Sequence, residues 1–294
     1  SNLDEISEKA RAIILEGQFP DSIRDDIKKA YQKLLKSYKG KMQVAVRSSA
    51  TAEDLPNASF AGQQETFLNI SGEQMLLESC KRCFASLFTS RAIKYRIDKG
   101  FKHMSVALSV GIQQMVRSDK GCSGVVFTIE PETGFKDVVV INGSWGLGDN
   151  VVQGAVDPDE YIVFKPSLQK GNKSIISKNI GSKQKTLIYA NRLDHDPEVT
   201  TTNIRTPKKK QEQFILDDNE VEELARWSMI IEEHYKKPMD IEWAKDGLNN
   251  EIYIVQARPE TVHAIKSKPH LLDTYELKEK GKVLASGTGI GNKI

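Results

Sequence analysis

The sequence has no long apolar run and no strong excess of charge, and each absence excludes a class of protein. No stretch approaches the roughly 18 consecutive apolar residues of a membrane-spanning helix. The 42 lysines and arginines against 40 aspartates and glutamates leave a formal net charge of +2, too even to indicate a nucleic-acid or membrane surface. We therefore predict no nucleic-acid and no membrane partner, and any site for a polyanion must be local.

Cysteine is scarce and a secretory signal is missing. The amino end is acidic and polar, where a signal peptide would be basic and then apolar, and 3 cysteines cannot all pair. We expect reduced thiols and a cytoplasmic location. Cys80 and Cys83 form a C-x-x-C that could be a redox pair or half of a zinc site. Both fall on the apolar face of a predicted helix and no second ligand pair follows, which favours core residues.

The hydrophobic pattern is helical near the start and strand-like afterwards. Apolar residues recur at helical spacing over 4–17 and 21–39, which predicts a helical hairpin, and again over 72–100. Beyond Ser105 they alternate, and a capped helix follows Asp217. We expect a polar, solvated loop over 191–213. Strands are predicted over 106–116, 123–128, 137–142, 160–164, 173–177 and 185–190.

The stretch from Val44 to Ile70 is the first candidate for chemistry. An alternating strand runs into Arg47 and then into some twenty residues rich in Ser, Thr, Ala and Gly. Small residues leave backbone N–H groups accessible, and a guanidinium beside them suits the phosphates of a nucleotide. A polar surface loop after an edge strand explains the composition equally well.

Residues 239–243 and 252–258 predict two strands joined by a turn that contains Asp246 and Gly247. Side chains two apart share a face, so Asp240 and Glu242 point one way, as do Gln256 and Arg258. Two carboxylates and an amide oxygen suit Mg²⁺, and Arg258 could neutralise a phosphoryl group. An exposed hairpin face with an arginine–carboxylate pair is the alternative.

Other features carry weaker signals. The strand end at 113–116 could meet an adenine edge, although such a pattern, taken alone, is more often an ordinary strand end. The glycine turn at 144–149 favours a structural role over phosphate binding. The cations at 91–99 suit the carboxyl end of a helix dipole better than a nucleic-acid patch, and the histidines show no ligand spacing.

With these residues identified, the chain resembles the phosphoenolpyruvate synthases (pyruvate, water dikinases), in their amino-terminal nucleotide-binding domain. The matching runs cover most of residues 40–265 in the family's order: VAVRSSATAEDLPNASFAGQQETFLNI, IQQMVRSDKGCSGVVFTIEPETGF, SWGLGDNVVQGAVDPDEY, GSKQKTLIYA and PMDIEWAKDG with YIVQARPETV. The resemblance implies an α+β fold of the ATP-grasp type. It also implies that a histidine on a separate domain attacks the β-phosphoryl of ATP, and that a barrel domain binds pyruvate.

The resemblance assigns roles to individual residues. Arg47 and Arg258 match arginines that contact the phosphates, and we predict both as catalytic residues. Glu242 and Gln256 match positions around Mg²⁺. Asp240 matches an acidic position of the same site. The remaining expected ATP contacts are the phosphate-covering loop with Gly62, Gln63, Gln64 and Thr66, and the adenine-contacting strand end with Gln114, Met115 and Val116.

Parts of the family's pattern are missing. The amino-terminal glycine-rich turn and ATP-binding lysine should precede residue 1, and the phosphohistidine domain should begin near 287–294. We therefore expect a helical remainder of the first lobe over 1–40, the nucleotide-binding domain over 41–262, and a linker into the next domain over 263–294. Alternatives are a pyruvate, phosphate dikinase, a rifampicin phosphotransferase, or a nucleotide-binding scaffold inactive in isolation.

Overall fold

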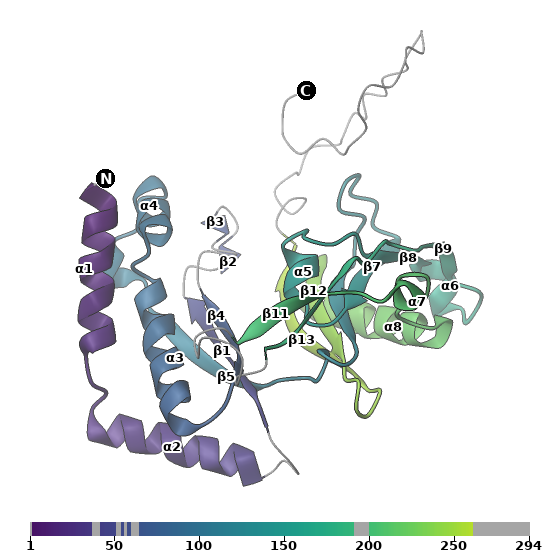
Figure 1. The fold of residues 1–294 in the computed structure, drawn as a ribbon. Helices are drawn as coiled ribbons and strands as arrows, with labels where there is room; N and C mark the ends of the chain where they lie inside the picture. Colours follow the sequence, from purple (N-terminus) through teal and green to yellow (C-terminus); the bar gives the residue numbers. More distant parts are fainter. Residues whose placement is uncertain are drawn as a thin grey trace, which may run out of the picture.

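The computed structural model describes residues 2–36, 42–50, 54–55, 58–59, 65–190 and 200–260. Helices and strands form two parts that lie side by side, each built on its own sheet (Figure 1). The predicted mixture of helix and sheet is confirmed. The expected linker over 263–294 lies outside the described residues.

The first part is a three-stranded antiparallel sheet in the order β4-β1-β5, with α3 packed against it. Its core is continuous because Val44 and Val46 of β1 meet Leu76 of α3, all at most 1% exposed. The elements of this part are α1 (Asn2–Glu16), α2 (Asp21–Lys36), β1 (Val44–Ala50), β2 (Asp54–Leu55), β3 (Ala58–Ser59), β4 (Thr66–Ile70), α3 (Glu73–Ser86), α4 (Ser90–Asp98), the 3₁₀ helix η1 (His103–Ser105) and β5 (Leu108–Gln114).

The second part is a six-stranded antiparallel sheet in the order β13-β12-β6-β7-β8-β9, covered on one face by α8. Strands β10 and β11 pair separately beside it. The elements are β6 (Cys122–Phe127), β7 (Val138–Trp145), α5 (Asp149–Val152), β8 (Asp159–Phe164), α6 (Lys165–Gln169), β9 (Ile175–Asn179), β10 (Lys185–Tyr189), β11 (Thr201–Arg205), α7 (Lys208–Gln211), α8 (Asp218–Tyr235), β12 (Met239–Lys245) and β13 (Ile252–Pro259).

Several predicted elements are confirmed. Helices α1 and α2 form as predicted. They do not lie antiparallel as a hairpin, because they run in different directions in Figure 1 and each packs on α3. The capping box of α8 is present, because Asp217 accepts from the Glu220 backbone and the Glu220 side chain accepts from the Asp217 backbone. The β12–β13 hairpin forms, with its strands paired antiparallel. None of the described helices is both long and apolar enough to cross a membrane.

Two predictions of secondary structure are wrong. The helix expected over 72–100 is broken into α3 and α4, because Thr89 is extended and its side chain accepts from the Ala92 backbone as an N-cap. The solvated loop expected over 191–213 contains β11 and α7, although 191–199 lie outside the described residues. Strand β11 forms because β10 supplies its backbone partners. The polar sequence of β11 does not predict a strand by itself.

The three cysteines are free and buried, so we predict that they are unreactive in the native protein. Burial raises the pKa of Cys80 to about 11 and those of Cys83 and Cys122 to about 12, which keeps the thiols protonated. At pH 8 an aromatic disulfide reagent should titrate no thiol in the native chain and all three in denaturant. Rapid reaction of one thiol without denaturant would contradict this packing.

Candidate functional site

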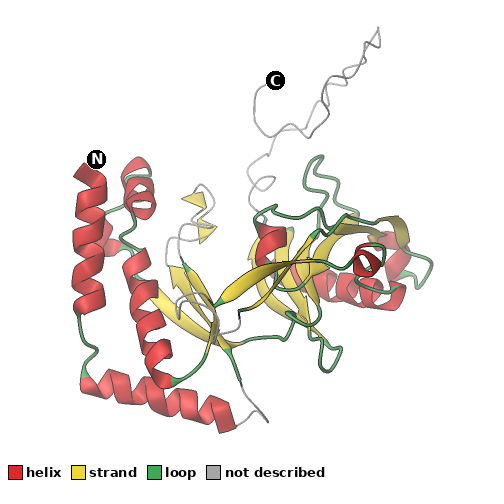
Figure 2. Cartoon of the chain, in the orientation of Figure 1, coloured by secondary structure: helices red, strands yellow, loops and turns green. Residues whose placement is uncertain are grey.

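A cleft of about 760 Å³ lies between the two sheets. One wall consists of residues of β1, β4 and β5, and the other of residues of β6, β12, β13 and the turn that leads into α5. In Figure 2 the strands of the two sheets, in yellow, lie between helices on the left and helices on the right. The side chains that line it are a mixture of polar and apolar groups and include charges of both signs. Predicted site residues on its surface are Arg47, Thr66, Gln114, Met115, Val116, Glu242, Gln256 and Arg258.

Arg47 extends from β1 across the cleft to the second sheet. Its Nη1 donates to the carbonyl oxygen of Val255 at 3.3 Å and to Oε1 of Gln113 at 3.4 Å. Within the described chain its hydrogen bonds involve Nη1 alone, which leaves Nε and Nη2 for an anion. From the sequence, the stretch that begins with β1 could be either a polar surface loop or part of a phosphate site. In the structure β1 forms part of one wall of the cleft.

The hairpin register places Asp240 opposite Arg258 and Glu242 opposite Gln256. Arg258 donates from Nε and Nη2 to Oδ2 of Asp240 at 2.8 and 2.7 Å. The arginine–carboxylate pair is thus real, and Asp240 does not reach the cleft surface. Asp240 fixes the Arg258 guanidinium without lining the cleft itself. Arg258 can therefore both pair with a carboxylate and line the cleft.

Among the predicted site residues, Glu242 is the carboxylate that lines the cleft. Burial raises its pKa, while the guanidinium groups of Arg47 and Arg258 oppose that shift. No hydrogen bond to this carboxylate occurs among the described residues, and no cluster of three or more His, Cys, Asp or Glu side chains forms there. The Glu242 carboxylate and the Gln256 amide could supply two hard oxygen atoms to Mg²⁺, which also takes water and phosphate oxygens.

The strand end expected to meet adenine runs directly into the segment that joins the two sheets. The Met115 backbone donates to the Gln43 carbonyl at 2.9 Å, which fixes this end of β5. Asp246, in the turn of the hairpin, accepts from the Arg117 backbone at 3.0 Å. The turn of the hairpin is thus held against the segment that follows the strand end. Thr66 of β4 lies on the same wall as this strand end, whereas Gly62, Gln63 and Gln64 lie outside the described residues.

Sequence reasoning missed several residues of the cleft. Gly148 and Asp149 line it, and both belong to the glycine turn at 144–149 that we interpret from the sequence as structural. The carboxylate that follows G-x-G is the signal that could have found them. Gln113 lines it too; it belongs to the strand end at 113–116, but the resemblance assigns the adenine contacts to Gln114, Met115 and Val116 alone.

The helix-dipole interpretation of the cations in α4 also needs correction. Arg91 lines the cleft, and Arg96 is 1% exposed, with Nε donating to His103 Nδ1 at 3.0 Å. Residue type alone would predict a buried Ile97 and an exposed Arg96, whereas the structure has the reverse.

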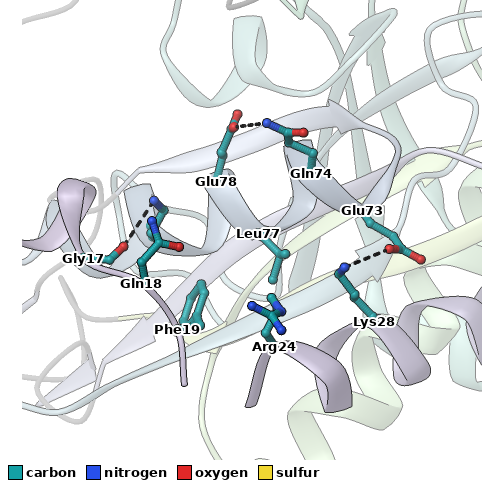
Figure 3. A pocket seen from close by; sticks show the side chains of 10 residues that line it. Gly17, Gln18, Phe19, Arg24, Lys28, Glu73, Gln74, Leu77 and Glu78 are labelled. Carbon is teal, nitrogen blue, oxygen red and sulfur yellow. Dashed lines mark hydrogen bonds and ion pairs between the residues drawn. The ribbon is translucent and has the colours of Figure 1, made fainter. Parts of the chain in front are cut away.

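A smaller hollow of about 430 Å³ lies where the α1–α2 connection meets α3 (Figure 3). Its charged groups already have partners within the chain. Lys28 lies 3.5 Å from Glu73, and Lys81 donates to the Leu15 carbonyl at 2.8 Å. This hollow therefore offers a ligand less unpaired charge than the cleft does.

Comparison with known proteins shows the family of the chain. Residues 1–279 match the family model described as "Pyruvate phosphate dikinase, AMP/ATP-binding domain". Curated phosphoenolpyruvate synthases are similar along the whole chain. That of Synechocystis sp. is 51% identical over 305 residues, covering 100% of this chain and 37% of the relative. That of Aquifex aeolicus is 52% identical over 297 residues, covering 97% and 34%.

The phosphoenolpyruvate synthase of Escherichia coli is more distant, at 45% identity over 300 residues, which cover 100% of this chain and 37% of the relative. The chain thus spans about a third of the length of these relatives. The family model nevertheless covers nearly all of it. The chain belongs to the pyruvate phosphate dikinase AMP/ATP-binding domain family.

Proposed function

We propose that this chain is the ATP-binding part of a phosphoenolpyruvate synthase and has an ATP-grasp fold. The parent enzyme would convert ATP, pyruvate and water to AMP, phosphoenolpyruvate and phosphate through a pyrophosphoryl-histidine on another domain. The observation that carries this proposal is the convergence of Arg47, Glu242, Gln256 and Arg258 on one cleft from two sheets. The names of the relatives support the synthase over the related dikinases.

In this proposal the ATP phosphates lie between Arg47 and Arg258. The two guanidinium groups come from opposite walls. When the bond between the β-phosphorus and its leaving oxygen breaks, the negative charge that develops on that oxygen would stay between fixed cations. Gln114, Met115 and Val116 receive the adenine at the strand end. Because Asp240 fixes Arg258 and the Val255 carbonyl fixes Arg47, little reorganisation is needed when the phosphates bind.

Glu242 and Gln256 would hold Mg²⁺. A bound Mg²⁺ neutralises phosphate charge and orients the phosphoryl oxygens. The protein's own contribution is to keep one carboxylate and one amide oxygen facing each other across β12 and β13. The other domains of the parent protein are the proposed partners, since they would supply the histidine and the pyruvate site.

Isothermal titration calorimetry of this chain with Mg-ATP tests the proposal. We expect heat that saturates at one site per chain, and a loss of affinity in Arg47→Ala. The absence of heat, in a chain that melts cooperatively, would favour a scaffold that is inactive in isolation.

Replacing Glu242 by glutamine should remove the effect of magnesium on ATP affinity. The amide keeps the size of the side chain but loses the charge that holds a hard cation. We expect added Mg²⁺ to raise the ATP affinity of the wild type, and the increase in affinity to be at least about tenfold smaller in the variant. The matched control is Glu251→Gln, on the same hairpin but exposed and outside the cleft. An equal gain in Glu242→Gln and wild type would remove Glu242 from the metal site.

A further inference from the structure

A β-bulge in the hairpin creates a contact between the two walls of the cleft. Glu242 lies opposite Gln256, but the next residue, Trp243, lies opposite Ile254. Val255 is therefore an extra residue in β13. A bulge takes the extra peptide out of the regular ladder, so the Val255 carbonyl is available to a group outside the sheet.

Gln113 and Arg47 both donate to that carbonyl. Nε2 of Gln113 lies 3.4 Å from the Val255 oxygen, and Nη1 of Arg47 lies 3.3 Å from it. Oε1 of Gln113 in turn accepts from Nη1 of Arg47 at 3.4 Å. The two side chains are diagonal neighbours, since Gln113 lies opposite Ala45 and Arg47 lies opposite Gly111 in register. One amide thus contacts both an arginine of the first sheet and the backbone of the second.

We infer that Gln113 is a positioning residue, which sets how Arg47 and the strand carrying Gln256 and Arg258 face each other across the cleft. The inference rests on the proposed function. Gln113 acts through two other groups: it holds one nitrogen of the Arg47 guanidinium, and it fixes the backbone one residue before Gln256. Its loss should therefore weaken contacts with the outer phosphates and leave contacts with the adenosine portion unchanged.

The test compares Mg-ATP and Mg-AMP binding by calorimetry in Gln113→Met, which keeps the length of the side chain and removes both hydrogen bonds. We expect ATP affinity to fall about fivefold to tenfold and AMP affinity to change less than about twofold. In an Arg47→Ala background the effect of Gln113→Met on ATP should become smaller, because only the contact with the Val255 carbonyl remains to be lost. Ser109→Ala, on the exposed end of the same strand, is the control and should change neither affinity. Equal losses for ATP and AMP, or an undiminished effect without Arg47, would overturn the inference.

A second measurement needs no nucleotide. Hydrogen exchange of the ligand-free chain should be faster over 252–258 in Gln113→Met than in wild type, and unchanged over 138–145 in the centre of the large sheet. Unchanged exchange over 252–258 would overturn the contact itself. If exchange over 252–258 is faster in Gln113→Met but the wild-type chain binds no ATP, the contact would be upheld and the proposed function would be refuted instead.

Discussion

Replacing Arg258 by alanine is expected to reduce AMP formation by the full-length enzyme about a thousandfold or more, while the fold survives. The reason is that Arg258 would face the phosphoryl group as charge develops, and a positioned arginine in phosphoryl transfer is worth about 10³–10⁵ in rate. Lysine at this position should not restore activity. It keeps the charge but cannot reproduce the paired Nε and Nη2 contacts with Asp240.

The control for this variant is Arg226→Ala, because that arginine makes only an exposed pair with Glu222 on α8. Far-ultraviolet circular dichroism and a melting curve show whether each variant is folded. Asp240→Asn should lower the rate less than Arg258→Ala does, since the guanidinium remains but loses a charged partner. Normal turnover in Arg258→Ala would remove this residue from the reaction.

Replacing Lys183 by methionine is expected to destabilise the chain by about 3–5 kcal/mol, because it leaves a buried carboxylate without its cation. The side chains of Lys183 and Asp159 are both 0% exposed and form an ion pair. Lys183 also donates to the Gly181 and Gln211 carbonyls at 2.9 and 3.2 Å. Asp159 accepts from the Ile215 backbone at 2.9 Å. One ion pair therefore joins β8 to the segments at Gly181, Gln211 and Ile215.

Urea denaturation, followed by tryptophan fluorescence, measures this effect. Lys178→Met is the matched control: Lys178 pairs with Asp218 at 2.7 Å, but the two side chains are 35% and 68% exposed. That exposed pair should contribute less than about 1 kcal/mol. Similar midpoints for the two variants would mean that the buried pair does not hold these segments together.

Local patterns were enough to predict the elements whose own residues dictate their structure. The β12–β13 hairpin has alternating apolar residues on both strands and an Asp-Gly turn, and it forms as expected. The capping box before α8 is equally local. The likeness to the synthases then indicated which polar residues would share a site, and most of those that the structure describes line one cleft.

The rest depends on contacts that sequence spacing does not encode. The bulge at Val255 arises from how β13 meets β12, and it decides which carbonyl reaches Arg47 and Gln113. Similarly, α4 buries Arg96 beside His103, and the polar strand β11 forms because β10 offers partners. These features follow from packing between distant segments, and local propensity cannot specify such packing.

Hydrogen exchange with and without Mg-ATP tests most directly whether a nucleotide occupies the cleft between the two sheets. Our account predicts slower exchange on both walls at once, over 44–48 and 113–116 on one side and over 240–242 and 255–258 on the other. Exchange in α1 and α2, beside the smaller hollow, should not change. Protection confined to the α1, α2 and α3 region, or no protection in a chain that binds Mg-ATP, would contradict it.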